Sequence, residues 1–175
     1  MQNFGMGNDP RAVANALLDI ADSYGIDVTN LSLNKLIFFI HTDCMIEKTR
    51  RLSSLTFEAW KFGPVLPIIY HQFKRFKRDP ITSRATRIDP KTGNSVVVDY
   101  KDLCVDAQYL EDRFLQYSRL SPSNLIALSH EPGGAWDAVW NGVVENVGMK
   151  ITDELILRYN YSGLKAKGDS DARLH

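Results

Sequence analysis

The apolar positions near the start of the chain recur at the spacing of a helix. Val13 and Leu17 fall on one face, together with the neighbouring apolar positions up to residue 24. Asp9 and Pro10 precede them, a pair typical of an N-cap and a first helical position. Gly25 follows the last periodic position and is suited to end a helix in a left-handed conformation. The pattern predicts a helix from about residue 10 to residue 24.

The next apolar segment has no polar face. Thr29 is a candidate N-cap, and the predicted helix runs from about Asn30 to Glu47. A helix that is apolar nearly all round belongs in the interior of a domain. We therefore expect this segment to be the central helix. The positions that surround it with apolar side chains are Leu33, Leu36, Ile37, Phe38, Phe39, Ile40, Cys44, Met45 and Ile46.

The rest of the chain mixes short extended segments with further helices. Residues 55–60 alternate like a strand, Gly63-Pro64 breaks the pattern, and residues 81–88 and 95–99 are typical of a hairpin. Helices are predicted over about 67–76, 102–117, 121–128 and 135–140, and from Thr152 onwards. The prediction is an α+β fold, predominantly α-helical, with a small antiparallel β element. We expect an N-terminal arm over 1–8, one domain over 9–161 and a disordered tail over 162–175.

Composition narrows the class of protein. The 175 residues carry equal numbers of acidic and basic side chains, 21 of each, so no bulk charge favours nucleic acid or an anionic membrane as partner. Cys44 and Cys104 are far apart and are expected to be buried free thiols in a reducing cytoplasm. The start of the chain does not resemble a signal peptide, and the apolar run 36–40 is far shorter than the ~20 residues that span a bilayer. We therefore predict a cytoplasmic protein without a membrane partner.

No residue pattern predicts catalysis. His41 and Cys44 lie one helical turn apart and could bind zinc, but no second ligand pair has recognisable spacing. Ser129-His130-Glu131 is a string of catalytic residue types, yet a triad is defined by geometry and not by adjacency. Phosphate-binding loops, dinucleotide-binding loops and metalloprotease motifs are not found in the sequence. We expect a protein that is not an enzyme and needs no cofactor.

A basic run after the helix at 67–76 supports an alternative function. Two phenylalanines, Phe73 and Phe76, interleave with its cations, a mixture that suits phosphate contact and base stacking. The same run is also explained if the aromatic rings face the core and the cations form a solvated face. The candidate nucleic-acid patch consists of Lys74, Arg75, Lys77, Arg78, Arg84 and Arg87.

The segment Glu58-Ala-Trp-Lys-Phe-Gly-Pro-Val65, followed by Pro67 and Tyr70, resembles the signature of the Panacea domain found in SocA-like antitoxins of bacteria and phages. Leu33-Asn-Lys-Leu-Ile-Phe38 is similar to the family's Leu-Gln-Lys-Leu-Leu-Tyr helix, and Ser129-His130 with Trp136 resembles its Ser-His…Pro-Trp segment. The matches follow the family's order. Asn34, Phe38 and Ala135 depart from the family's usual Gln, Tyr and Pro, which leaves details of packing open.

The resemblance implies an antitoxin that neutralises a cognate toxin through protein–protein binding, or that delivers the toxin to a bacterial protease as an adaptor. Two interpretations of the signature remain open. Gly63 and Pro64 could shape a turn that Trp60, Phe62 and Tyr70 pin against the central helix, with Lys35 reaching solvent or Glu58. Alternatively, Trp60, Lys61 and Phe62 are exposed anchors that contact the toxin. The candidate residues are Lys35, Glu58, Trp60, Lys61, Phe62, Gly63, Pro64, Val65, Tyr70, His130 and Trp136.

Overall fold

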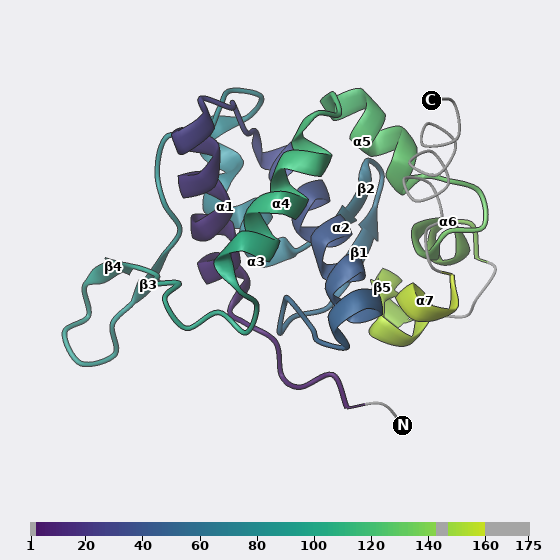
Figure 1. The fold of residues 1–175 in the computed structure, drawn as a ribbon, viewed down its shortest axis with the longest axis horizontal. Helices are drawn as coiled ribbons and strands as arrows, with labels where there is room; N and C mark the ends of the chain where they lie inside the picture. Colours follow the sequence, from purple (N-terminus) through teal and green to yellow (C-terminus); the bar gives the residue numbers. More distant parts are fainter. Residues whose placement is uncertain (1–2, 143–146, 160–175) are drawn as a thin grey trace.

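Helices dominate the computed structural model, which describes residues 3–142 and 147–159 (Figure 1). The fold is α+β and mainly helical, as predicted. In chain order the elements are α1 (Pro10–Tyr24), α2 (Asn30–Lys48), β1 (Phe57–Trp60), β2 (Gly63–Val65), α3 (Pro67–Phe73), the 3-10 helix η1 (Lys74–Phe76), β3 (Thr86–Ile88), β4 (Ser95–Val97), α4 (Ala107–Ser118), α5 (Pro122–Ser129), α6 (Ala135–Trp140), the 3-10 helix η2 (Val147–Met149), β5 (Lys150–Ile151) and α7 (Asp153–Arg158). No helix within the described ranges is long and apolar enough to cross a membrane.

Helix α1 has the predicted bounds, and α2 begins at the predicted residue and ends one residue beyond the predicted Glu47, at Lys48. The Asp9 side chain accepts a hydrogen bond from the Arg11 amide, and Gly25 closes α1 in the left-handed conformation at φ 64°. Thr29 caps α2 through a reciprocal pair of hydrogen bonds with Ser32. These local contacts satisfy backbone groups that a helix end leaves unpaired.

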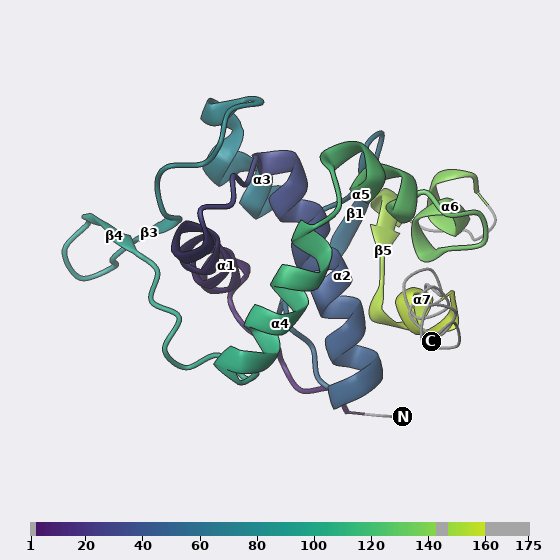
Figure 2. The same cartoon turned by 45° about the horizontal axis from the view of Figure 1, so that its top comes forward.

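Helix α2 is the centre of the molecule. Every residue from Ser32 to Met45 is buried. Helices α1 and α4 lie on one side of α2, and the strands β1, β2 and β5 lie on the other side, an arrangement that both ribbon views show (Figures 1 and 2). The prediction of a central apolar helix is therefore confirmed.

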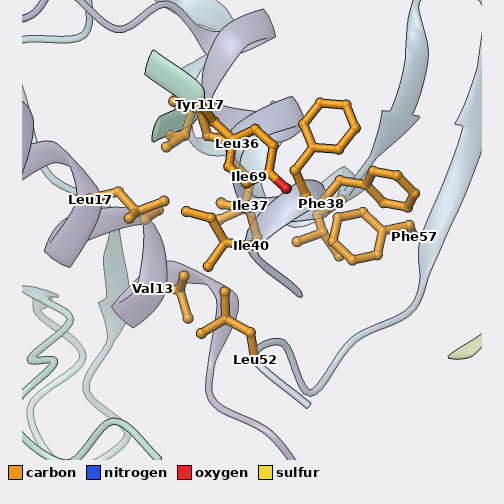
Figure 3. Packing of buried hydrophobic residues seen from close by; sticks show 14 of the residues in the cluster. Val13, Leu17, Leu36, Ile37, Phe38, Ile40, Leu52, Phe57, Ile69 and Tyr117 are labelled. Carbon is orange, nitrogen blue, oxygen red and sulfur yellow. The ribbon is translucent and has the colours of Figure 1, made fainter. Parts of the chain in front are cut away.

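The apolar core joins α2 to both of its flanks (Figure 3). Toward α1, buried Ile37 and Ile40 belong to the same cluster as Val13 and Leu17. Toward the sheet, the ring of Phe38 meets that of Phe57 edge to face, with 5.2 Å between centroids. Burial of rings of this size contributes a large share of the stability of a domain.

The main sheet has the strand order β2-β1-β5 and is antiparallel throughout. Trp60 pairs with Gly63, so the chain reverses at Lys61–Phe62. The first strand does end before Gly63, as predicted, but Gly63 and Pro64 belong to the returning strand β2, which was not predicted. The third strand, β5, pairs Lys150 with Glu58 and was not predicted.

Several other boundaries differ from the predicted ones. Helix α4 begins at Ala107, not at residue 102, because Asp106 caps it by accepting from the Tyr109 amide at 2.8 Å. The hairpin strands β3 and β4 are shorter than 81–88 and 95–99. Helix α3 ends at Phe73 and continues to Phe76 as a 3-10 turn. The predicted tail at 162–175 and the end of the predicted domain at 161 lie outside the described residues.

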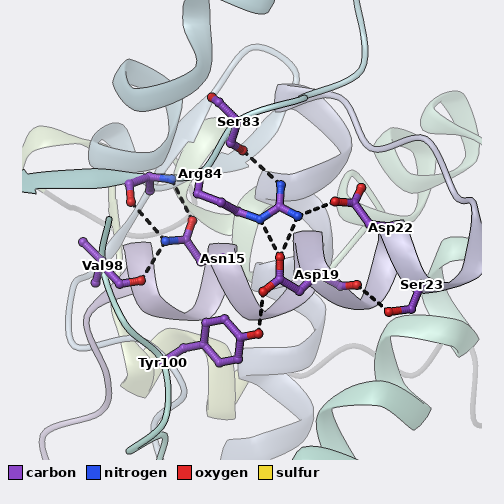
Figure 4. Close-up of polar contacts among 9 residues, drawn as sticks. Asn15, Asp19, Asp22, Ser23, Ser83, Arg84, Val98 and Tyr100 are labelled. Atoms are coloured by element: carbon purple, nitrogen blue, oxygen red, sulfur yellow. Dashed lines mark hydrogen bonds and ion pairs between the residues drawn. The ribbon is translucent and has the colours of Figure 1, made fainter. Parts of the chain in front are cut away.

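A buried asparagine ties the β3–β4 segment to the helical body. From α1, the side-chain amide of Asn15 donates to the carbonyls of Ala85 and Val98 at 3.0 and 2.9 Å. Its carbonyl oxygen accepts from the Ala85 amide at 2.7 Å (Figure 4). One side chain thus bonds three backbone groups, of which the Ala85 carbonyl also accepts from the Val98 amide at 3.0 Å.

Candidate functional site

Lys35 lies at the centre of the signature residues and is almost completely buried, with 1% of its surface exposed. Its Nζ donates to the Pro64 carbonyl on β2 at 2.8 Å. Burial disfavours the charged amine and lowers the pKa of Lys35 to about 7. The expectation that Lys35 reaches solvent or Glu58 is wrong, because the side chain extends from α2 to the neighbouring strand instead.

Gly63 allows β2 to approach α2 and α5 closely. Its φ is +104°, a conformation that other residues rarely adopt. A β-carbon at this position would lie 2.4 Å from Ser129 Oγ and 2.6 Å from Lys35 Cε. Both conformation and space therefore require glycine here, and Pro64 follows as a buried residue of the strand.

Glu58 lies on β1, the central strand of the main sheet. Its carboxylate accepts a hydrogen bond from Trp60 Nε1 at 2.9 Å and forms an ion pair with Lys150 of β5. The pKa of Glu58 is lowered, chiefly because Lys150 donates to it. This contact holds the short strand β5 against β1.

Trp136 locks the turn from the side of α6. Its indole Nε1 donates to the Trp60 carbonyl at 2.9 Å. One face of the ring stacks on His130, with 3.6 Å between centroids and 10° between planes, and Trp136 also stacks with Trp140 at 5.4 Å. The pKa of His130 is lowered by burial and, to a smaller extent, by the positive charge of Lys35. The Ser129-His130 and Trp136 motifs thus meet the β1–β2 turn in space.

Of the remaining signature residues, Val65 is buried on β2, whereas Lys61, Phe62 and Tyr70 are exposed. Phe62 at the tip of the turn is 54% exposed, so the expectation that its ring packs against the central helix is wrong. Lys61 is also exposed, and its Nζ lies 5.5 Å from the centre of the Phe62 ring. Tyr70 is 38% exposed, and its ring meets the partly buried Trp60 ring edge to face at 5.0 Å. Lys61, Phe62, Tyr70 and Trp60 together form what we call the aromatic turn surface.

The six cations of the candidate nucleic-acid patch do not form one surface. Arg84 forms ion pairs with Asp19 and Asp22, so its guanidinium is directed at α1 (Figure 4). Arg87 lies on β3, and Arg75 donates to Ser83 at 2.7 Å. The exposed cations that remain together on and just after η1 are Lys74, Arg75, Lys77 and Arg78.

The side chains of His41 and Cys44 are buried in the interior of the protein. His41 Nδ1 accepts from the Ser53 amide at 3.1 Å, and its Nε2 lies 3.2 Å from a carboxylate oxygen of Asp153. Burial lowers the pKa of His41 and raises the pKa of the Cys44 thiol to about 12. Cys104 differs from expectation in being only partly buried. Among residues 3–142 and 147–159, no group of three or more His, Cys, Asp or Glu side chains could hold a metal ion.

Three residues of the site were not among the sequence candidates. Asn34 accepts from the Leu66 amide at 2.9 Å and so holds the start of α3. Ser129 donates to the Ile126 carbonyl at 2.8 Å and contacts the position of Gly63. Lys150 pairs with Glu58. A polar residue inside the otherwise apolar helix α2 was the available signal for Asn34, whereas the strand pairing that brings Lys150 to β1 has no local signal.

Comparison with known proteins gives one family and one curated relative. The family model described as the SocA-like antitoxin, Panacea domain, matches residues 33–137. The chain is also 39% identical over 150 residues to the antitoxin SocA of Caulobacter vibrioides (strain NA1000 / CB15N), an alignment that covers 85% of this chain and 80% of that protein. No solved structure gives a significant match.

Proposed function

We propose that this chain, which belongs to the SocA-like antitoxin family with the Panacea domain, neutralises a cognate toxin by binding it directly. Family membership carries the proposal, since the match includes all of the signature residues from Lys35 to Trp136. It suggests a regulatory role without catalysis. In such a role Lys35 is a structural residue whose amine holds β2 in place.

The aromatic turn surface is the proposed contact with the toxin. Large apolar rings at a surface are unfavourable to hydrate, and aromatic residues dominate the binding energy of protein interfaces. Phe62 projects from a turn that is fixed from within by Gly63 and by the Trp136 hydrogen bond. A contact surface that is rigid before binding loses little conformational entropy when the complex forms.

Direct binding can end in two ways. The antitoxin can occupy the toxin and hold it inactive, or it can act as an adaptor that passes the bound toxin to a bacterial protease. We propose sequestration as the basic step, because a stable complex is required in both cases. The half-life of the toxin in cells separates them: it stays unchanged in sequestration and shortens if the chain is an adaptor.

The experiment is co-expression with the protein encoded by the neighbouring gene. Expression of the neighbour alone should stop growth, and co-expression of the antitoxin should restore it. The two proteins should also purify as one complex. A neighbour that is harmless alone and forms no complex would contradict the proposal.

The surface is tested with a matched pair of exposed apolar residues. Phe62→Ala should abolish rescue and complex formation, whereas Ile88→Ala on β3, which is also highly exposed, should leave both intact. Both variants should unfold within about 0.5 kcal/mol of the wild type, as surface changes do. If Phe62→Ala rescues growth as well as Ile88→Ala does, the turn is not the contact, although the antitoxin function itself would stand.

A further inference from the structure

A groove of about 430 Å³ lies between α1 and α4. These two helices flank α2 on the side away from β1 and β2 (Figures 1 and 2). Helix α1, the segment leading into α4 and the start of α4 itself form its walls. Apolar side chains make up much of the lining, among them Ile20 from α1, Leu103 and Val105 from the segment, and Leu110 from α4. Clefts that bury drug-sized ligands have volumes in this range.

Two tyrosines rim the groove, and each is held by a carboxylate from another element. The Tyr24 hydroxyl of α1 donates to Glu111 of α4. The Tyr100 hydroxyl donates to Asp19 of α1, a contact visible in Figure 4. These hydrogen bonds connect the walls of the groove.

The rim is acidic. Asp19 and Asp22 share a single guanidinium, that of Arg84. Glu111 accepts from a neutral hydroxyl, and no ion pair with it is found in the described part of the chain. Among the described residues that line the groove, Asp19 and Glu111 are acidic and Lys101 is the one cation. The carboxylates of Asp112 and Asp99 lie near Tyr24 and Tyr100 and add negative charge at the rim.

We propose that this groove binds a basic, amphipathic segment of a partner protein. Its apolar side chains would lie against Ile20, Leu103 and Val105, and its Lys or Arg side chains would pair with Glu111 and Asp19. An apolar groove with charges at its rim is how many proteins hold an amphipathic helix. Nucleic acid does not fit, because its phosphates would face carboxylates.

The groove is independent of the aromatic turn surface and of the antitoxin proposal. Its α1 wall precedes residue 33, where the match to the family model begins, whereas its other wall, from Tyr100 to Glu111, lies within the matched range. None of the signature residues is among those that line the groove.

The first test is selection of peptides from a random displayed library on the intact protein. Enriched peptides should carry apolar residues at helical spacing together with Lys or Arg. Their binding should weaken as salt rises, because exposed charge pairs are screened. Enrichment of acidic or uncharged peptides, or no enrichment at all, would overturn the proposal.

Two double variants with the same change in charge locate the binding. Val105→Arg with Glu111→Lys alters the groove, and Val97→Arg with Asp79→Lys alters exposed positions elsewhere. A selected synthetic peptide should lose at least about tenfold in affinity on the groove variant, equivalent to one charge contact or more. It should bind the control like the wild type. Equal binding to both variants would refute the groove as the site.

Glu111→Gln keeps the size of the side chain and removes only its charge, so it answers the question if the double variant does not fold. It should bind the basic peptide more weakly than Asp79→Asn does. Sedimentation distinguishes a second copy of this chain as occupant. A wild-type dimer that becomes monomeric on Glu111→Gln substitution would mean that the groove is a self-association surface, contrary to the proposal.

Discussion

Replacing Gly63 with alanine tests the central packing of the site. The added β-carbon would lie 2.4 Å from Ser129 Oγ and 2.6 Å from Lys35 Cε, closer than unbonded atoms tolerate. Lys35 cannot swing away freely, because its Nζ is bound to the Pro64 carbonyl in a buried setting. Overpacking of this kind costs about 1–3 kcal/mol. The positive φ of +104° adds strain of about 1–2 kcal/mol for any residue with a β-carbon.

The expected loss is therefore about 2–5 kcal/mol, a large part of the ~5–15 kcal/mol that stabilises a typical domain. Gly93→Ala is the matched control. Gly93 also has a positive φ, 71°, but nothing lies within 4 Å of its added β-carbon. Gly93→Ala should therefore be destabilised only by the backbone strain, by about 1–2 kcal/mol.

Urea unfolding followed by tryptophan fluorescence measures both variants. Trp60 and Trp136 lie at the turn, so their emission reports directly on the packing that Gly63 allows. A slope of about 2–3 kcal/mol per molar urea converts the expected loss into a midpoint lower by about 1–2 M for Gly63→Ala. Equal midpoints for Gly63→Ala and Gly93→Ala would mean that β2 does not approach α2 and α5 as closely as described.

Two further substitutions test buried polar groups. The pKa of Lys35 is about 7 in the folded protein and 10.5 in an unfolded chain, so between these values the unfolded chain binds more protons and stability rises with pH. Lys35→Met should lack this rise, which is at most about 1.4 kcal/mol per pH unit. Urea unfolding of both proteins from pH 7 to 10 measures it. If the free energy of unfolding changes with pH in the same way in both proteins, the prediction is wrong. Asn15→Ala should cost about 2–4 kcal/mol, since it leaves the Ala85 amide and the Val98 carbonyl unpaired. A loss below about 1 kcal/mol, measured by urea unfolding, would show that those two groups find other partners.

The helices were predictable because their signals are local. Asp9, Gly25 and Thr29 cap or terminate helices through bonds to residues a few positions away. The apolar character of α2 is likewise a property of consecutive residues, and it correctly placed that helix at the centre. The start of α4 was predicted wrongly. Asp102 and Asp106 both precede apolar residues, and only Asp106 caps the helix.

The contacts that define the site are between residues far apart in sequence. Lys35 and Glu58 looked like partners because they are opposite charges in neighbouring elements. In the structure Lys35 instead donates to the Pro64 carbonyl of β2. Glu58 pairs with Lys150, which the pairing of β5 with β1 brings close. The two-residue strand β5 is too short to leave a pattern in the sequence. The groove was equally hidden, since its walls come from α1 and α4.

The hairpin also explains why the signature cannot have a single role. Along Glu58–Val65 the chain enters the molecule at buried Ala59, leaves it at Lys61 and Phe62, and returns at buried Gly63. Neighbours in one motif therefore experience opposite environments, as strand and turn geometry requires. Substituting the inward residues should act through stability, and substituting the outward ones should act through binding. At Phe62 the effect on binding can be measured without an effect on stability. The turn on both sides of Phe62 is held by backbone pairing and by the Trp136 hydrogen bond, and neither involves the Phe62 ring.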